Sequence, residues 1–139
     1  MERTTRYSRK REAILDAIRS TDIHPSADWV YQTLKSAFPD LSLGTVYRNL
    51  SRFKEEGLIA SVGTVQGQER FDAIVTPHPH FICQACGAVM DLPGVKAEEN
   101  LDLDRIARQN GVEIDHHVLI LYGTCPGCSP KDKKAKPQN

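Results

Sequence analysis

Two Cys-x2-Cys pairs constrain this chain more than any other feature of its sequence. Cys83 and Cys86 lie in FICQACG, Cys125 and Cys128 lie in GTCPGC, and no other cysteine is present. Four thiolates paired in this way can bind one tetrahedral Zn²⁺, provided that the fold brings the two turns together. The 38 residues between the pairs exceed the interval of a compact zinc finger, but one helix and one strand could return the chain. We therefore predict a structural zinc site formed by all four cysteines.

The alternative for these cysteines is a redox pair of the thioredoxin kind. Such a motif occurs once, between a strand and a helix, and depends on a lowered thiol pKa. Two copies on expected turns favour metal instead. No apolar run approaches the roughly 18–20 residues that span a bilayer, and no secretion signal is recognisable. We expect a cytoplasmic protein, and reducing conditions there disfavour disulfides.

The first half of the 139 residues predicts a winged helix. Apolar periodicity indicates helices over 8–20, 26–38 and 42–57, with Ser26 and Ser42 in capping position. Two short alternating runs, 58–65 and 68–75, then indicate a β-hairpin that turns near Gly67. Three helices and a hairpin over residues 1–74 would make a winged-helix DNA-binding domain. A generic helical bundle with a polar face is the alternative.

A winged helix would place its third helix in the major groove of double-stranded DNA. Tyr47 and Arg48 are then the candidates for base-edge contacts and Arg52 for a phosphate contact. Arg11, with its neighbours Arg9 and Lys10, is a further candidate for the DNA backbone. The 18 basic and 18 acidic residues balance overall, so this basic arm counts only together with the fold.

The second half predicts a small α/β dimerisation and metal-binding domain over 75–128. HFICQACGAVMDL suggests a hairpin that turns at 85–87, residues 95–111 an amphipathic helix, and residues 112–123 a strand. The run VLILY is apolar on both faces, which suggests pairing across the boundary of a homodimer. Residues 129–139 are basic and lack apolar anchors, so we expect a disordered tail. The fold class is α+β.

A second group of ligands contains no sulfur. His78 and His80 alternate on an extended segment, so both imidazoles face one side. Asp72 precedes them, Asp91 follows them, and His24 lies before the second helix. Three histidines and two aspartates suit Fe²⁺ or Mn²⁺ better than a thiolate-seeking ion.

Several motifs, in order, resemble the ferric uptake regulator (Fur) family. They span roughly residues 8–128 and read HPSADWVYQTL, SLGTVYRNLSRFKEEGLI, RFD, HPHFICQACG, VMDL and LYGTCPGC. The resemblance implies a homodimeric winged-helix transcriptional repressor with a four-cysteine zinc site and a regulatory Fe²⁺ or Mn²⁺. The five regulatory ligands would be His24, Asp72, His78, His80 and Asp91.

Asp91 favours one subgroup of that family. Iron-uptake regulators usually have Glu at this position, whereas the peroxide-sensing (PerR) subgroup has Asp. The resemblance thus implies that Fe²⁺-catalysed oxidation of His24 or His78 releases DNA, a self-modification and no enzyme activity. An iron-responsive repressor of iron uptake is the nearest alternative. A zinc-ribbon redox protein or metallochaperone is more remote, and a metal-dependent hydrolase more remote still, because five ligands leave little room for substrate.

Overall fold

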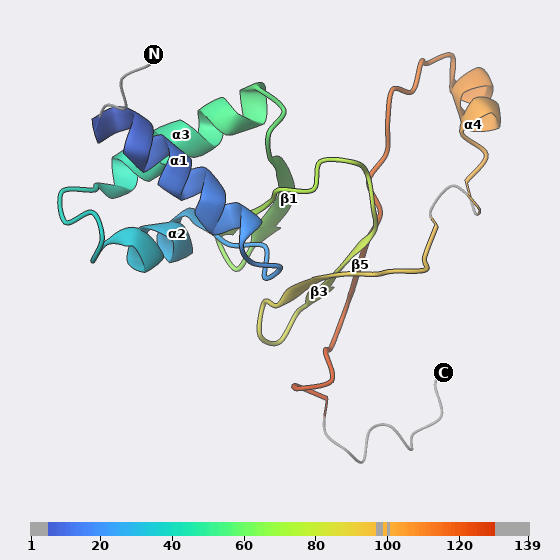
Figure 1. Cartoon of the computed structure of the whole chain (residues 1–139). Helices are drawn as coiled ribbons and strands as arrows, with labels where there is room; N and C mark the ends of the chain where they lie inside the picture. The colour runs from blue at the N-terminus through green and yellow to red at the C-terminus, as the bar shows by residue number, and fades with distance from the viewer. Residues whose placement is uncertain (1–5, 97–98, 100, 130–139) are drawn as a thin grey trace. The chain divides into compact units, whose positions relative to one another are not determined.

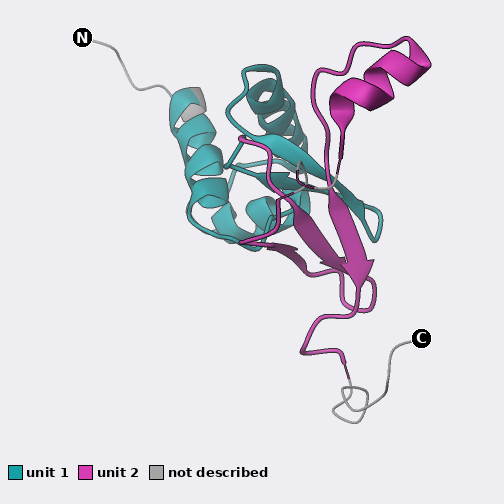
Figure 2. Cartoon of the chain, turned by 90° about the vertical axis from the view of Figure 1, so that its right-hand side faces the viewer, with its two compact units in different colours: residues 1–75 teal, residues 76–139 magenta. Residues whose placement is uncertain are grey.

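The protein is described by a computed structural model over residues 6–96, 99 and 101–129. Residues 130–139, which include nearly all of the expected basic tail, lie outside this range. The chain divides into two compact units, Met1–Val75 and Thr76–Asn139, which Figure 2 shows in teal and magenta. Over the described residues, every helix is too short or too polar to cross a lipid bilayer.

Three helices form the first unit, and two of them begin at the expected serine caps. They are α1 (Arg6–Arg19), α2 (Ala27–Leu34) and α3 (Leu43–Glu55), which pack against one another (Figure 1). Ser26 Oγ accepts the N–H of Trp29, and Ser42 Oγ accepts the N–H of Thr45, each at 3.1 Å. Each bond satisfies a backbone donor that has no partner inside the helix.

The core of this unit contains the apolar positions that the helical periodicity predicts. Ile14 and Ile18 of α1 meet Val30 of α2 and Leu50 and Phe53 of α3, and all five are at most 1% exposed. Burying side chains of this size contributes about 1.5–3 kcal/mol each, which makes this cluster the main source of stability in the unit. The polar face of α3 remains in solvent.

A two-stranded antiparallel hairpin completes the first unit. Strand β1 (Ala60–Val65) pairs with β2 (Gln68–Asp72), and the turn contains Gln66 and Gly67 with φ of 52° and 82°. An isolated bridge between Ser26 and Arg70 attaches β2 to the start of α2. The predicted winged helix is confirmed, with this hairpin as its wing.

The second unit is built on a three-stranded sheet with the order β4-β3-β5. Strands β3 (His80–Cys83) and β4 (Val89–Asp91) form an antiparallel hairpin, and β5 (Ile120–Gly123) runs parallel to β3. A parallel neighbour requires a crossover, and this crossover carries α4 (Leu103–Asn110). With the winged helix, this mixed sheet confirms the α+β class.

Three elements are shorter than the sequence predicts by at least four residues at one end. Helix α2 ends at Leu34 rather than residue 38, and α4 begins at Leu103 rather than residue 95. The side chain of Asp102 accepts the N–H of Arg105 and so caps α4 there. Among residues 112–123 only Ile120–Gly123 are strand, because β3 offers partners to these four residues alone. In each case the apolar sequence pattern covers more residues than the regular hydrogen-bonded element does.

Candidate metal and DNA-binding sites

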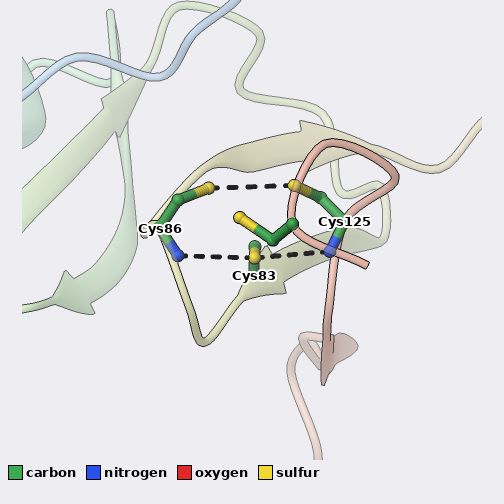
Figure 3. A group of neighbouring side chains, drawn as sticks. Cys83, Cys86 and Cys125 are labelled. Atoms are coloured by element: carbon green, nitrogen blue, oxygen red, sulfur yellow. Dashed lines mark hydrogen bonds between the residues drawn. The ribbon is translucent and has the colours of Figure 1, made fainter. Parts of the chain in front are cut away.

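The four cysteines converge in the second unit, and Figure 3 labels three of them, Cys83, Cys86 and Cys125. One ligand atom from each of Cys83, Cys86, Cys125 and Cys128 lies within 4.8 Å of all the others. The Sγ atoms of Cys86 and Cys125 are 3.8 Å apart, far longer than the roughly 2.05 Å of a disulfide. Four sulfurs bound to one tetrahedral ion at about 2.3 Å would lie about 3.8 Å apart, so the cluster fits Zn²⁺.

The sheet explains how thiols so distant in sequence meet. Cys83 is the last residue of β3, and its partner in the parallel register is Gly123, the last residue of β5. The N–H of Gln84 donates to the carbonyl oxygen of Gly123, which continues the pairing one step further. Both chains then turn at the same end of the sheet, one into Cys86 and the other into Cys125.

Hydrogen bonds give Cys83 the character of a thiolate. The backbone N–H groups of Cys125 and Cys86 donate to its Sγ at 3.3 and 3.5 Å and lower the pKa of this thiol to about 6. The sulfurs of Cys86 and Cys125 raise the pKa of Cys128 to about 12. Without a cation Cys128 is therefore protonated, and metal binding must displace its proton.

The second unit also joins two imidazoles to one carboxylate. Asp91 Oδ1 lies 3.0 Å from His78 Nε2 and 3.3 Å from His80 Nε2, and the two rings are 4.3 Å apart. His80 and Asp91 are cross-strand partners in the β3–β4 hairpin. Donor atoms at about 2.1 Å from one octahedral ion lie about 3.0 Å apart, so these three side chains fit an N/O-bound divalent metal.

The first unit brings together the other two predicted ligands. His24 Nε2 lies 3.3 Å from Asp72 Oδ2, and these residues are 3% and 8% exposed. Asp72 Oδ1 accepts the N–H of Ile74 at 2.9 Å, which fixes the carboxylate at the end of the wing. Burying a histidine and an aspartate is costly unless they are paired, and a cation between them would compensate both.

The exposed face of α3 presents a short chain of hydrogen bonds. The hydroxyl groups of Ser42 and Thr45 are 2.9 Å apart, and Arg48 Nη2 donates to Thr45 Oγ1 at 3.0 Å. A Cβ on Gly44 would lie 3.4 Å from Arg48 Nη1, which is close to ordinary van der Waals contact. Thr45 was missing from the predicted contacts, although helical spacing places residues 42, 45 and 48 on one face.

Arg52 and Arg11 differ in their surroundings. Arg52 lines the same open surface of α3 as Tyr47 and Arg48. The guanidinium of Arg11 instead forms an ion pair with Glu56 at 2.7 Å and lies 4.6 Å from the ring centre of Phe53. Lys10 pairs with Asp40 at 3.3 Å. Lys10 and Arg11 therefore have intramolecular partners that the sequence did not indicate.

Apolar side chains of the second unit remain exposed in the single chain. Val118 is 68% exposed, Leu121 43% and Tyr122 60%, and α4 buries none of its residues. The run VLILY, apolar on both faces, thus has exposed side chains on β5 and just before it. Exposed apolar side chains of this size are common where proteins associate.

A winged helix followed by a unit with thiolate and imidazole–carboxylate clusters defines a class of metal-binding transcriptional regulators. Residues 2–122 match the model of the ferric uptake regulator family, and the chain belongs to this family. It is 37% identical to the peroxide operon regulator of Bacillus subtilis over 133 residues. The aligned region covers 94% of this chain and 89% of that protein.

Two further relatives are also named for peroxide. The chain is 34% identical to the peroxide-responsive repressor PerR of Staphylococcus aureus over 127 residues, 91% of this chain and 84% of that one. The crystal structure of the Campylobacter jejuni peroxide stress regulator superposes with a TM-score of 0.71 at 25% identity, over 90% of this chain and 93% of that one. The family resemblance seen in the sequence is confirmed.

Proposed function

We propose that this chain is a homodimeric, metal-dependent repressor that binds operator DNA in the cytoplasm and releases it when hydrogen peroxide oxidises a ligand histidine. The observation that carries the proposal is Asp91, a carboxylate within 3.3 Å of both His78 and His80, in a chain whose relatives are named for peroxide response. Glutamate is longer by one methylene, so its carboxylate would lie at a different position relative to the two imidazoles.

A structural Zn²⁺ at the four cysteines is the first part of this proposal. The sulfur spacing supports a closed tetrahedral site that leaves no position for a substrate or peroxide. Zinc-bound thiolates in such a site are protected, so the cysteines are not the sensor. Cys83 at the end of β3, Cys86 after it, and Cys125 and Cys128 after β5 would hold the ion, which would stabilise the pairing of these two strands.

The regulatory metal is the second part. His24 and Asp72 from the winged helix and His78, His80 and Asp91 from the second unit would together bind one Fe²⁺ or Mn²⁺. The close pair in one unit and the close triad in the other support this assignment. Five ligands shared by two units would favour one orientation of the recognition helices, and a few kcal/mol of preference suffices for a ~10²-fold change in DNA affinity.

The histidines then determine the response to peroxide. His78 Nδ1 lies 2.7 Å from the carbonyl oxygen of Thr76, so Nδ1 carries the proton and Nε2 is left as the ligand atom. Bound Fe²⁺ would supply the redox chemistry that cleaves the O–O bond, which Mn²⁺ supplies far less readily. The imidazole of His24 or His78 would gain one oxygen at a ring carbon and lose two electrons, while the second peroxide oxygen leaves as water.

DNA binding belongs to the exposed face of α3. Tyr47 and Arg48 are proposed to contact base edges and Arg52 a phosphate, which the shared open surface supports. The hydrogen bond to Thr45 would restrict the Arg48 side chain before it meets a bidentate acceptor such as guanine. Arg11 would contact the DNA backbone only by giving up its ion pair with Glu56.

The test is anaerobic and uses the zinc-loaded protein with a duplex selected from random DNA by the Mn²⁺-loaded form. Fe²⁺-loaded and Mn²⁺-loaded samples receive a small excess of hydrogen peroxide, and DNA binding and peptide mass are followed together. We expect one added oxygen on the peptide with His24 or His78, and release of DNA, in the Fe²⁺ sample alone. D91E is the matched variant and should bind DNA but oxidise more slowly.

Other outcomes would identify the alternatives. Unmodified histidines with DNA still bound in the Fe²⁺ sample would leave an iron-responsive repressor. If no duplex is selected with any metal loaded, a zinc-ribbon redox protein or metallochaperone becomes the better description.

A further inference from the structure

The loop before α2 contains a backbone conformation that an ordinary residue rarely adopts. His24 has φ 58°, in the left-handed region where an L-residue is crowded by the adjacent carbonyl oxygen. Among the described residues other than glycine, only Gln66 shares a positive φ, and Gln66 lies in the exposed turn of the wing. His24 is buried instead, and Pro25 restricts its backbone further. Contacts from outside the loop must therefore stabilise this conformation.

Arg70 of β2 supplies these contacts. Its Nε donates to the carbonyl oxygen of His24, and its Nη2 donates to that of Ile23 at 2.8 Å. The backbone adds two more links, a bridge between Arg70 and Ser26 and a 3.0 Å hydrogen bond from the N–H of Phe71 to the carbonyl oxygen of Pro25. Four successive loop residues are thus tied to two successive residues of one strand.

The position of Arg70 on β2 connects this loop to a predicted metal ligand. Residues 70 and 72 alternate with Phe71, so they lie on the same face of the strand. Asp72 contacts the imidazole of His24, with Nε2 and Oδ2 3.3 Å apart, while Arg70 contacts its carbonyl oxygen. Burial lowers the pKa of the Arg70 guanidinium, and its two carbonyl acceptors compensate the hydration that it loses.

We propose that Arg70 is a positioning residue of the regulatory metal site, which holds His24 in its left-handed conformation so that the imidazole is already beside Asp72 when the metal binds. The proposal rests on the proposed function, because it requires His24 to be a ligand. Metal binding then does not have to order the loop, and the affinity of the site is higher for that reason.

The sign of the effect separates positioning from electrostatics. A guanidinium near a divalent cation repels it, so an electrostatic role alone predicts that removal of Arg70 tightens metal binding. Positioning predicts the opposite. Residues that orient a ligand from behind typically change metal affinity by about 10–100-fold.

The experiment measures Mn²⁺ binding to the full chain with its zinc in place, by the electron paramagnetic resonance signal of free Mn²⁺. R70M should weaken binding by about 10–100-fold, because methionine keeps the length and loses the donors. R70K should lose less Mn²⁺ affinity than R70M, because the lysine can still donate to one carbonyl oxygen. E69Q, which changes the adjacent strand residue, should stay within about twofold of the parent.

A second pair of proteins tests whether Arg70 acts through His24. In an H24A background R70M should cause no further loss, because the residue that Arg70 positions is gone. Mn²⁺ binding by R70M as tight as in the parent, or an equal loss in both backgrounds, would overturn the role of Arg70. If R70M does not fold, R70K in the two backgrounds gives the same comparison.

Failure of the proposed function gives a different result. A parent chain that binds no Mn²⁺, or an H24A variant that binds it as the parent does, removes His24 as a ligand and the role of Arg70 with it. If the parent binds Mn²⁺ and both R70M and H24A bind it more weakly, the result supports His24 as a ligand and Arg70 as its positioning residue.

Discussion

Replacing Gly123 by alanine tests whether the zinc cluster depends on the parallel pairing of β5 with β3. A Cβ at position 123 would lie 3.2 and 3.3 Å from Cε1 and Cζ of Phe81. Carbon atoms prefer about 3.5–4.0 Å, so either the ring or β5 must shift by a few tenths of an ångström. Because Gly123 directly opposes Cys83, a shift of β5 also moves Cys125 relative to Cys83.

Two effects of opposite sign determine how much G123A changes stability. Overpacking typically costs about 1–3 kcal/mol, whereas alanine in place of glycine inside a strand stabilises by about 0.5–1 kcal/mol. The net expectation for G123A is a loss of about 0–2.5 kcal/mol, and its midpoint of about 1.25 kcal/mol corresponds to roughly eightfold weaker zinc retention. G127A is the matched control, since its Cβ would meet its nearest neighbour, Cys125 Sγ, at an ordinary 3.9 Å.

The assay is competition for zinc by a coloured chelator, together with thermal unfolding of the zinc-loaded protein. G123A should release zinc at lower chelator concentration than the parent, and G127A should not. In an F81L background, where the ring is gone, G123A should become neutral or slightly stabilising. Equal zinc retention by G123A and the parent, or an equal loss with Leu at position 81, would refute the argument from the Phe81 contact.

Three further predictions address other parts of the molecule. F53A should destabilise the winged helix by about 3–5 kcal/mol in urea unfolding, because Phe53 is 0% exposed, and a loss under 1 kcal/mol would contradict its central place in the core. T45V should weaken operator binding about 2–10-fold by releasing Arg48, and an added R48A should then cost less than in the parent, whereas strict additivity in gel-shift titrations would speak against the coupling. Y122D should shift the protein toward monomer in sedimentation analysis while zinc content is unchanged, and an unaltered dimer would place the association surface elsewhere.

Much of the winged helix could be predicted because local signals agree there. Ser26 and Ser42 are efficient caps, and Val46, Leu50 and Phe53 follow the helical period on one face of α3. Each signal acts within a few residues, so the sequence alone is sufficient to recognise it. Spacing also indicated the four-cysteine cluster, because two pairs with no remaining cysteine leave few arrangements.

What could not be predicted depends on contacts between distant residues. The guanidinium of Arg11 meets Glu56, which lies 45 positions later, and Arg70 meets a carbonyl oxygen 46 positions earlier. No periodicity reports such pairs. The positive φ of His24 could not be predicted either, because a histidine before proline does not favour it. The apolar run of 112–123 was read as one strand because pattern records which side chains avoid water, not which backbone groups have partners.

The parallel pairing of β5 with β3 has a consequence for the order in which the second unit assembles. The cysteine pairs close a loop of 38 residues, and closing a loop of that length costs roughly 3–4 kcal/mol of chain entropy. The β3–β4 hairpin closes a far shorter loop and can form early, whereas β5 must wait for its crossover. Cys125 and Cys128 reach Cys83 and Cys86 only when β5 has paired with β3, so zinc held by all four cysteines would stabilise the completed sheet.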